Sequence, residues 1–182
     1  NDRQSFARSP TLAFPLVIPA PRHPTHVVSS DDTAFALSVV DSTIHVLDVK
    51  ASDFAGSTVS GSVDTYRTPA SLKLEQAEFQ GAFPVALRSK GSDVFVLFDR
   101  PATQDTMLSQ LRLDASAGSW SIGSVQTTTL AVGSPRDFIL RDELETVAVV
   151  SGAATSSVAV VGLVDAGGFD SPRYIDAGGP TH

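Results

Sequence analysis

The chain has 182 residues, of which 42% are hydrophobic and 18% are charged. This composition excludes a disordered chain, which needs low hydrophobicity and high net charge. The formal charge of −7 argues against nucleic acid or an anionic membrane surface as the main partner. The lack of cysteine excludes disulfides and thiolate metal sites, and no apolar run approaches the length of about 18 residues that spans a membrane.

The first 23 residues precede a series of repeats and contain one short apolar run. This run, Thr11–Ile18, includes Pro15, and a proline inside a strand is tolerated only at a sheet edge or a bulge. We interpret segment 1–23 as an outer strand that closes a ring of sheets by joining the last one.

Three similar units follow in the chain, at residues 24–83, 84–134 and 135–179. Each unit contains four short runs of β-forming residues separated by turn-forming residues, as expected for consecutive antiparallel strands. A proline stands before the first run of each unit, at Pro24, Pro84 and Pro135, and Pro180 begins what we interpret as a fourth unit. Four strands in roughly 40–50 residues are typical of β-propeller blades.

Patterns within the units agree with blades. The second runs of two units, Val94–Phe98 and Val147–Val150, are apolar throughout, which favours strands buried on both faces. Helical periodicity is nearly absent: only Ala70–Gln80 fits a short helix, and the alternation of its leucines fits a strand equally well. The polar stretch Ser57–Ser62 is interpreted as the outer strand of the first unit.

The third unit carries the most specific pattern. Its third run reads Ser-Ser-Val-Ala-Val-Val-Gly-Leu from Ser156, and it closes with Ile-Asp-Ala-Gly-Gly-Pro from Ile175. Together with the starting proline and an acidic turn, these runs resemble the YVTN-type β-propeller repeat of bacteria and archaea, a relative of WD-repeat blades. The resemblance covers about residues 24–182 and implies an all-β propeller built from four-stranded antiparallel blades.

Three blades do not close a ring, because propellers contain about four to eight. We therefore expect this chain to be part of a larger propeller, or other chains to complete the ring. The alternative architecture is a β-sandwich of about twelve short strands in two sheets.

Two histidines occupy equivalent places in the repeat. His26 and His182 each end a Pro-Thr-His sequence at the start of a first strand, beside the central channel of a propeller. Imidazoles there form a candidate metal site, and the resemblance leaves a metal or haem at the channel open. The alternative is a repeated turn-filling motif without a resident cofactor, because no carboxylate or further histidine stands nearby at metal-ligand spacing.

Two aromatic residues are candidates for partner binding. Trp120 and Tyr174 lie in the fourth runs of their units, where an exposed aromatic side chain can anchor a partner. Single aromatics on an edge strand are also favourable β-formers.

The consecutive residues Arg136 and Asp137 follow Pro135, the first proline of the third unit. We interpret them as part of an ion pair within one blade.

The sequence assigns no catalytic residue, because it lacks nucleophile-elbow, zinc-protease and phosphate-loop motifs. We therefore expect a non-catalytic propeller scaffold that binds protein partners through loops on one face, outside the cytoplasm: in the periplasm, at the cell surface or secreted. Two alternatives stay open. One is part of a propeller enzyme, either a lactonase-like hydrolase or a haem- or metal-dependent oxidoreductase with its site at the channel. The other is a subunit of a larger surface assembly.

Overall fold

The computed structural model describes seven ranges: residues 24–30, 33–48, 70–116, 119–141, 146–151, 157–164 and 167–176. Within them the chain forms three four-stranded sheets, each antiparallel and each built from strands in sequence order. No α-helix occurs among the described residues. The prediction of an all-β fold made of four-stranded antiparallel blades is confirmed.

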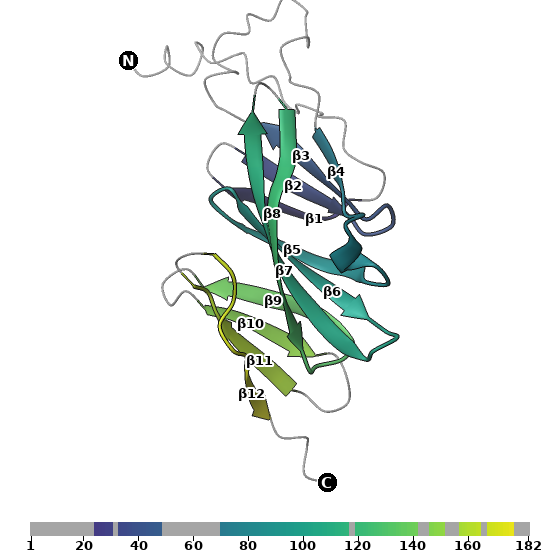
Figure 1. Ribbon diagram of the computed structural model, residues 1–182, viewed down its shortest axis with the longest axis vertical. Coiled ribbons are helices and arrows are strands. Elements are labelled where there is room, and N and C mark those ends of the chain that lie inside the picture. Colours follow the sequence, from purple (N-terminus) through teal and green to yellow (C-terminus); the bar gives the residue numbers. More distant parts are fainter. Residues whose placement is uncertain are drawn as a thin grey trace, which may run out of the picture.

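The sheets follow one another along the long axis of the molecule (Figure 1). Blade 1 consists of β1 (Pro24–Ser30), β2 (Thr33–Ser38), β3 (Thr43–Asp48) and β4 (Ala70–Lys73). Blade 2 consists of β5 (Phe83–Lys90), β6 (Asp93–Arg100), β7 (Asp105–Ser116) and β8 (Ser119–Leu130). Blade 3 consists of β9 (Pro135–Arg141), β10 (Thr146–Ser151), β11 (Ser157–Gly162) and β12 (Arg173–Asp176).

The first strands of the blades, β1, β5 and β9, lie next to one another. β1 and β9 begin with a proline and β5 has one as its second residue, and the register shifts directly after Pro24, Pro84 and Pro135. Proline has no N–H to give to the sheet, which is why it is confined to strand starts and bulges. The repeated proline in the sequence therefore marks a repeated backbone irregularity.

A first apolar cluster joins blades 1 and 2. It includes Phe35 and Ile44 from blade 1 and Val94, Val96 and Phe98 from β6. These side chains come from one face of each strand, because successive residues of a strand point to opposite sides.

A second apolar cluster joins blades 2 and 3. Phe95 and Leu97 of β6 pack there against Phe138, Val147 and Val149. Strand β6 thus fills both clusters with alternate residues, and all five residues from 94 to 98 are buried. The expectation of a strand buried on both faces is met in blade 2, where a sheet lies on each side.

The segment 70–80 contains both a strand and a single helical turn. Residues Ala70–Lys73 form β4, the outermost strand of blade 1, and Ala77–Phe79 form a 3₁₀ turn, η2. Burial explains why the first part is a strand and the second a helical turn. Leu72 is buried and pairs with Ile44 in the sheet. The ring of Phe79 stacks on that of Phe98, with 4.8 Å between the ring centroids. The stretch 57–62 lies outside the described residues, as do segment 1–23 and the start of the fourth unit.

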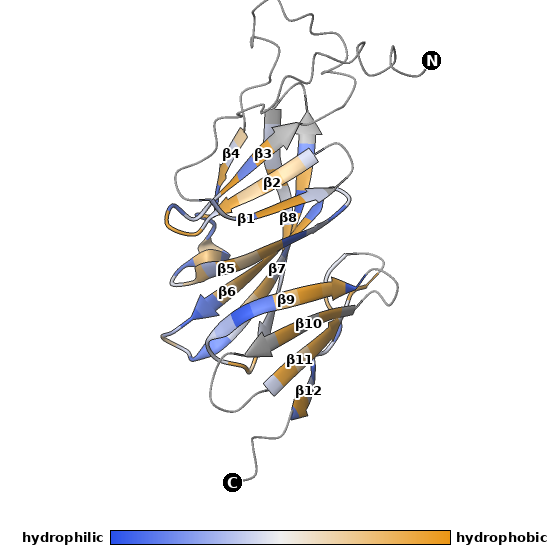
Figure 2. Cartoon of the chain, turned by 180° about the vertical axis from the view of Figure 1, so that it is seen from behind, coloured by the Kyte–Doolittle hydropathy of each residue, from blue (hydrophilic) through white to orange (hydrophobic). Residues whose placement is uncertain are grey.

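Blade 3 has one face packed on blade 2 and one open face. On the open face Ile139 is 58% exposed and Ile175 is 56% exposed, while Val158 and Val160 are half-buried. The strand β11 in this sheet is hydrophobic along most of its length (Figure 2). The corresponding face of blade 2 is the one that blade 3 covers.

Candidate functional site

A charged pair and a histidine stand on the three neighbouring first strands. Arg88 of β5 donates two hydrogen bonds from its Nη2 to the carboxylate of Asp137 of β9, both 2.8 Å long. The charges of both groups act on the pKa of His26 on β1. In a closed propeller the innermost strands border the central channel, so these residues lie on the strands nearest to it.

The local backbone and the neighbouring ring hold the pair in position. The Arg88 guanidinium carbon lies 5.5 Å from the centroid of the Phe138 ring, within reach of a cation–π interaction. Its Nη1 donates to the carbonyl of Leu87 at 2.7 Å. The backbone N–H of Phe138 donates to Asp137 Oδ1 at 2.8 Å, so both charged groups are oriented from two sides.

His26 is a neutral base at neutral pH. Burial lowers the pKa of His26 below 6.5; the negative charge of Asp137 opposes this effect, and the positive charge of Arg88 adds to it. Its Nδ1 lies 3.3 Å from the Thr25 hydroxyl oxygen. A neutral imidazole accepts a proton, so the cluster combines a base, a fixed cation and a carboxylate.

The structure corrects one ion pair expected from the sequence. Asp137 pairs with Arg88 of the neighbouring blade, whereas the sequence suggested a pair with Arg136 inside one blade. Arg136 is the residue that the register shift at the start of β9 leaves unpaired in the sheet, between Pro135 and Asp137. No local signal in the sequence pointed to Arg88, because its partner lies 49 residues away.

Of the other candidate residues, Trp120 and Tyr174 lie in the described part of the chain and His182 does not. His182 lies outside the described residues, so the pairing with His26 stays a prediction, and the part of the chain that is described holds no cluster of three or more potential metal ligands. Trp120 is partly buried and packs against the first apolar cluster. Tyr174 is 48% exposed, and its hydroxyl accepts a hydrogen bond from the Ala131 N–H at 3.0 Å.

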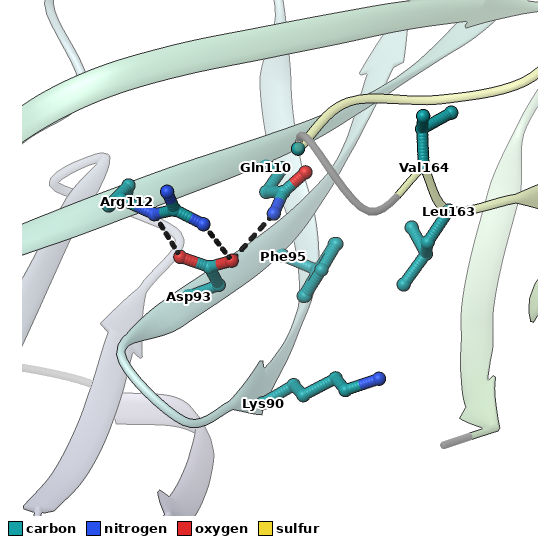
Figure 3. Close-up of a pocket in the computed structure, with 8 residues that line it drawn as sticks. Lys90, Asp93, Phe95, Gln110, Arg112, Leu163 and Val164 are labelled. Carbon is teal, nitrogen blue, oxygen red and sulfur yellow. Dashed lines mark hydrogen bonds and ion pairs between the residues drawn. The ribbon is translucent and has the colours of Figure 1, made fainter. Parts of the chain in front are cut away.

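A hollow of about 180 Å³ lies between blades 2 and 3 (Figure 3). Its lining residues are Lys90, Asp93, Phe95, Gln110, Arg112, Leu163, Val164 and Gly167. Asp93 receives hydrogen bonds from Gln110 at 2.7 Å and from Arg112 at 3.0 and 3.1 Å. Gln110 in turn accepts a hydrogen bond from the buried Gly168 N–H at 2.8 Å, which ties the segment after β11 to blade 2.

The sheets and their repeated inner strands define the architecture as part of a β-propeller. A solved structure with this fold, that of the Pseudomonas aeruginosa periplasmic gluconolactonase PpgL, is similar with a TM-score of 0.62 and 18% sequence identity. The similarity covers 91% of this chain and 43% of the gluconolactonase chain, so this chain spans less than half of that protein.

Sequence comparisons are negative. No protein-family model matches the chain, and no curated protein matches it. The YVTN assignment therefore stays a prediction, while the propeller architecture rests on the sheets and on the structural similarity. No helix among the described residues has the length and apolar character to cross a membrane.

Proposed function

We propose that this chain supplies the channel-side part of a propeller hydrolase that opens a lactone ring. The observation that carries the proposal is the placement of His26, Arg88 and Asp137 on three adjacent innermost strands. The similarity of fold to a gluconolactonase supports the same class of reaction. A shared fold alone does not transfer an activity, and the chemistry of these three side chains is what supports the reaction.

The three groups match the needs of lactone hydrolysis. A water oxygen attacks the carbonyl carbon of the ring while the neutral imidazole of His26 takes the proton from that water. The carbonyl electron pair moves to its oxygen, and the Arg88 guanidinium stabilises the resulting oxyanion. The ring C–O bond then breaks, the leaving alkoxide takes the proton from the imidazolium, and the product is a hydroxy acid.

Asp137 acts in this scheme as a positioning residue. Two hydrogen bonds to one guanidinium nitrogen fix Arg88 relative to β9, and a fixed cation stabilises a developing charge without reorganising. The same carboxylate raises the affinity of His26 for a proton, although burial outweighs this effect in the resting protein.

The scaffold interpretation has less support than the hydrolase. Trp120 is engaged in core packing, and the Tyr174 hydroxyl already has an internal partner, so neither side chain is fully available as an anchor. The fold similarity is to an enzyme that is described as periplasmic, and we propose an extracytoplasmic location for this chain as well.

The proposal is tested by measuring acid release from gluconolactone by the native protein. We expect His26→Gln to lower kcat by about 100-fold or more, the usual contribution of a general base. His45→Gln is the matched control: His45 lies on β3 of the same blade and pairs with the Ser71 hydroxyl at 3.1 Å, and its loss should change kcat by less than about twofold.

A second pair of variants tests the cation. Arg88→Met should lower kcat, whereas Arg141→Met, an exposed arginine on β9, should leave it unchanged. The proposal is wrong if His26→Gln behaves like His45→Gln, or if the native protein opens lactones no faster than buffer does.

A further inference from the structure

The outermost strand of blade 2 has an unpaired edge. β8 is twelve residues long and lies last in its sheet. Among the residues that the structure describes, β8 pairs only with β7, and the two strands form a long hairpin that extends alongside blade 1 (Figure 1). The free edge of such a strand presents backbone N–H and C=O groups that can pair with a further strand.

The outermost strands of the other two blades are protected against such pairing, and β8 is not. β4 and β12 are each four residues long, and both contain charged residues. Short length and charge are means by which proteins prevent sheets from joining edge to edge. β8 contains neither a charged residue nor a proline, and no charge occurs anywhere from 115 to 134. Among three blades of one plan, β8 is therefore the outer edge that is open to a partner strand.

The regular part of this edge is the segment 124–130, which is centred on Thr127. At one end Gly123 has no partner in β7, because the register of the two strands shifts there, and such a bulge interrupts pairing. At the other end Ala131 follows the strand, and its N–H already donates to the Tyr174 hydroxyl. A partner strand that uses the whole regular edge is therefore centred opposite Thr127.

Charged side chains beside the segment are engaged within blade 2. Strand β7, which adjoins β8, contains three of them: Asp105, Arg112 and Asp114. The first pairs with Arg100 and the second with Asp93, both on β6. The carboxylate of Asp114 lies against Gly123 at the bulge, and its charge also acts on Arg112. The edge that a partner strand would meet is thus uncharged.

We propose that β8 pairs antiparallel with β8 of a second copy of this chain, about a two-fold axis at Thr127. A two-fold contact brings the same segment together from both copies, so Thr127 lies opposite Thr127, and Val125 lies opposite Thr129. Cross-strand pairs of threonine and of β-branched residues are favourable. The formal charge of −7 lies outside 115–134, so two copies meet at this edge without like charges opposite each other. The edge is on an outermost strand, so the pairing does not depend on the hydrolase proposed for the innermost strands.

Sedimentation equilibrium of the whole chain tests the proposal. A strand pair of this length is smaller than stable interfaces, which have roughly 20–30 residues a side. We therefore expect weak dimerisation, with a Kd of about 0.1 mM. Because the net charges of two copies repel, raising NaCl from about 20 to about 500 mM should tighten the association.

Charge variants at Thr127 test the register. Thr127 is exposed, and Thr127→Lys places two lysines opposite each other, which should weaken association about fivefold or more. Thr127→Glu should do the same with two carboxylates. An equimolar mixture of the two variants should associate again, with a Kd within about twofold of the native value, because lysine then faces glutamate.

Gln80→Lys and Gln80→Glu are the matched controls. They add the same charges at an exposed position after η2, outside the strands, and should leave the Kd within about twofold of the native value. Thermal unfolding of each variant shows that it is folded.

Each other outcome overturns the proposal. A native chain that stays monomeric at about 1 mM, ten times the expected Kd, does not pair through β8. If Thr127→Lys associates as the native chain does, the copies meet at another surface. If both Thr127 variants lose association and their mixture does not recover it, the strands are not paired about Thr127.

Discussion

The guanidinium of Arg88 and the carboxylate of Asp137 connect the innermost strands of two neighbouring blades across 49 residues of sequence. Asp137 is 56% exposed, whereas Arg88 is 30% exposed and also lies over the Phe138 ring. The contact therefore combines a partly screened ion pair with aromatic packing.

Replacing Arg88 should destabilise the protein more than replacing Asp137. Asp137→Asn removes only the ion pair, which is worth about 0.2–1 kcal/mol at such exposure. Arg88→Met also removes the contact with Phe138, worth about 0.5–1 kcal/mol more. Urea denaturation of the two single variants measures the difference in cost, and the double variant adds the coupling energy between Arg88 and Asp137. A coupling energy near zero would show that the ion pair contributes nothing.

Stability should fall as the pH drops from about 7.5 to about 5.5. Burial lowers the pKa of both His26 and His45 below 6.5, against the opposing charges of Asp137 and Asp41. Between the lowered pKa and 6.5 the unfolded chain binds more protons than the folded chain, so the free energy of unfolding rises with pH there and is complete above 6.5. Urea denaturation at several pH values measures this slope.

The double variant His26→Gln, His45→Gln is the control for that slope. Without the two imidazoles the free energy of unfolding should change less over the same range. An identical pH dependence in the double variant would assign the effect to other groups.

The turn between β6 and β7 should depend on Asp105. Burial acts most strongly on the pKa of Asp105 and raises it, but hydrogen bonds from Arg100 and Thr103 and the charge of Arg100 together outweigh this effect, so the pKa is lowered. The stabilisation is present above the unfolded pKa and is lost as the pH falls through the folded pKa. Asp105→Asn should cost about 1–2 kcal/mol at neutral pH, measured by urea denaturation, and should cost little in acid.

Gln110 should stabilise the packing of blade 3 against blade 2. Its amide donates to Asp93 and accepts from the Gly168 N–H, and it is 8% exposed. Gln110→Met leaves both partners without these bonds and should cost about 1–3 kcal/mol, with faster hydrogen exchange at Gly168. Gln126, the exposed residue opposite Gln110 on β8, is the matched control. Equal losses of stability in Gln126→Met and Gln110→Met would contradict a stabilising role for the two hydrogen bonds of Gln110.

Truncating a core residue should lower the free energy of unfolding much more than truncating a residue on the open face of blade 3. Phe98 is fully buried and stacks on Phe79, so Phe98→Ala should cost about 3–5 kcal/mol. Ile139→Ala on the open face of blade 3 should cost less than about 1 kcal/mol. Thermal or urea denaturation measures both, and a core-like cost at Ile139 would show that another sheet covers this face in solution.

Local sequence patterns predicted the sheets well. They did not predict contacts between residues that are far apart in the chain. The continuous apolar run in β6 and the prolines at the starts of β1, β5 and β9 were readable, because each depends on its own strand. The segment 70–80 was ambiguous, because only the burial of Leu72 and Phe79 against other elements decides between strand and helical turn. Arg88 went unnoticed as a site residue, because its partner belongs to another blade.

Local sequence patterns are sufficient to predict the all-β class, the four-stranded antiparallel unit and the apolar character of the second strands. These follow from residue-by-residue periodicity and turn chemistry, which act over a few residues. The polar contacts follow from the folded arrangement alone: Arg88 pairs with Asp137, whose charge acts on His26, and Arg112 and Gln110 bind Asp93. Such contacts depend on how neighbouring blades pack, because side chains far apart in the chain become neighbours only after the sheets have stacked.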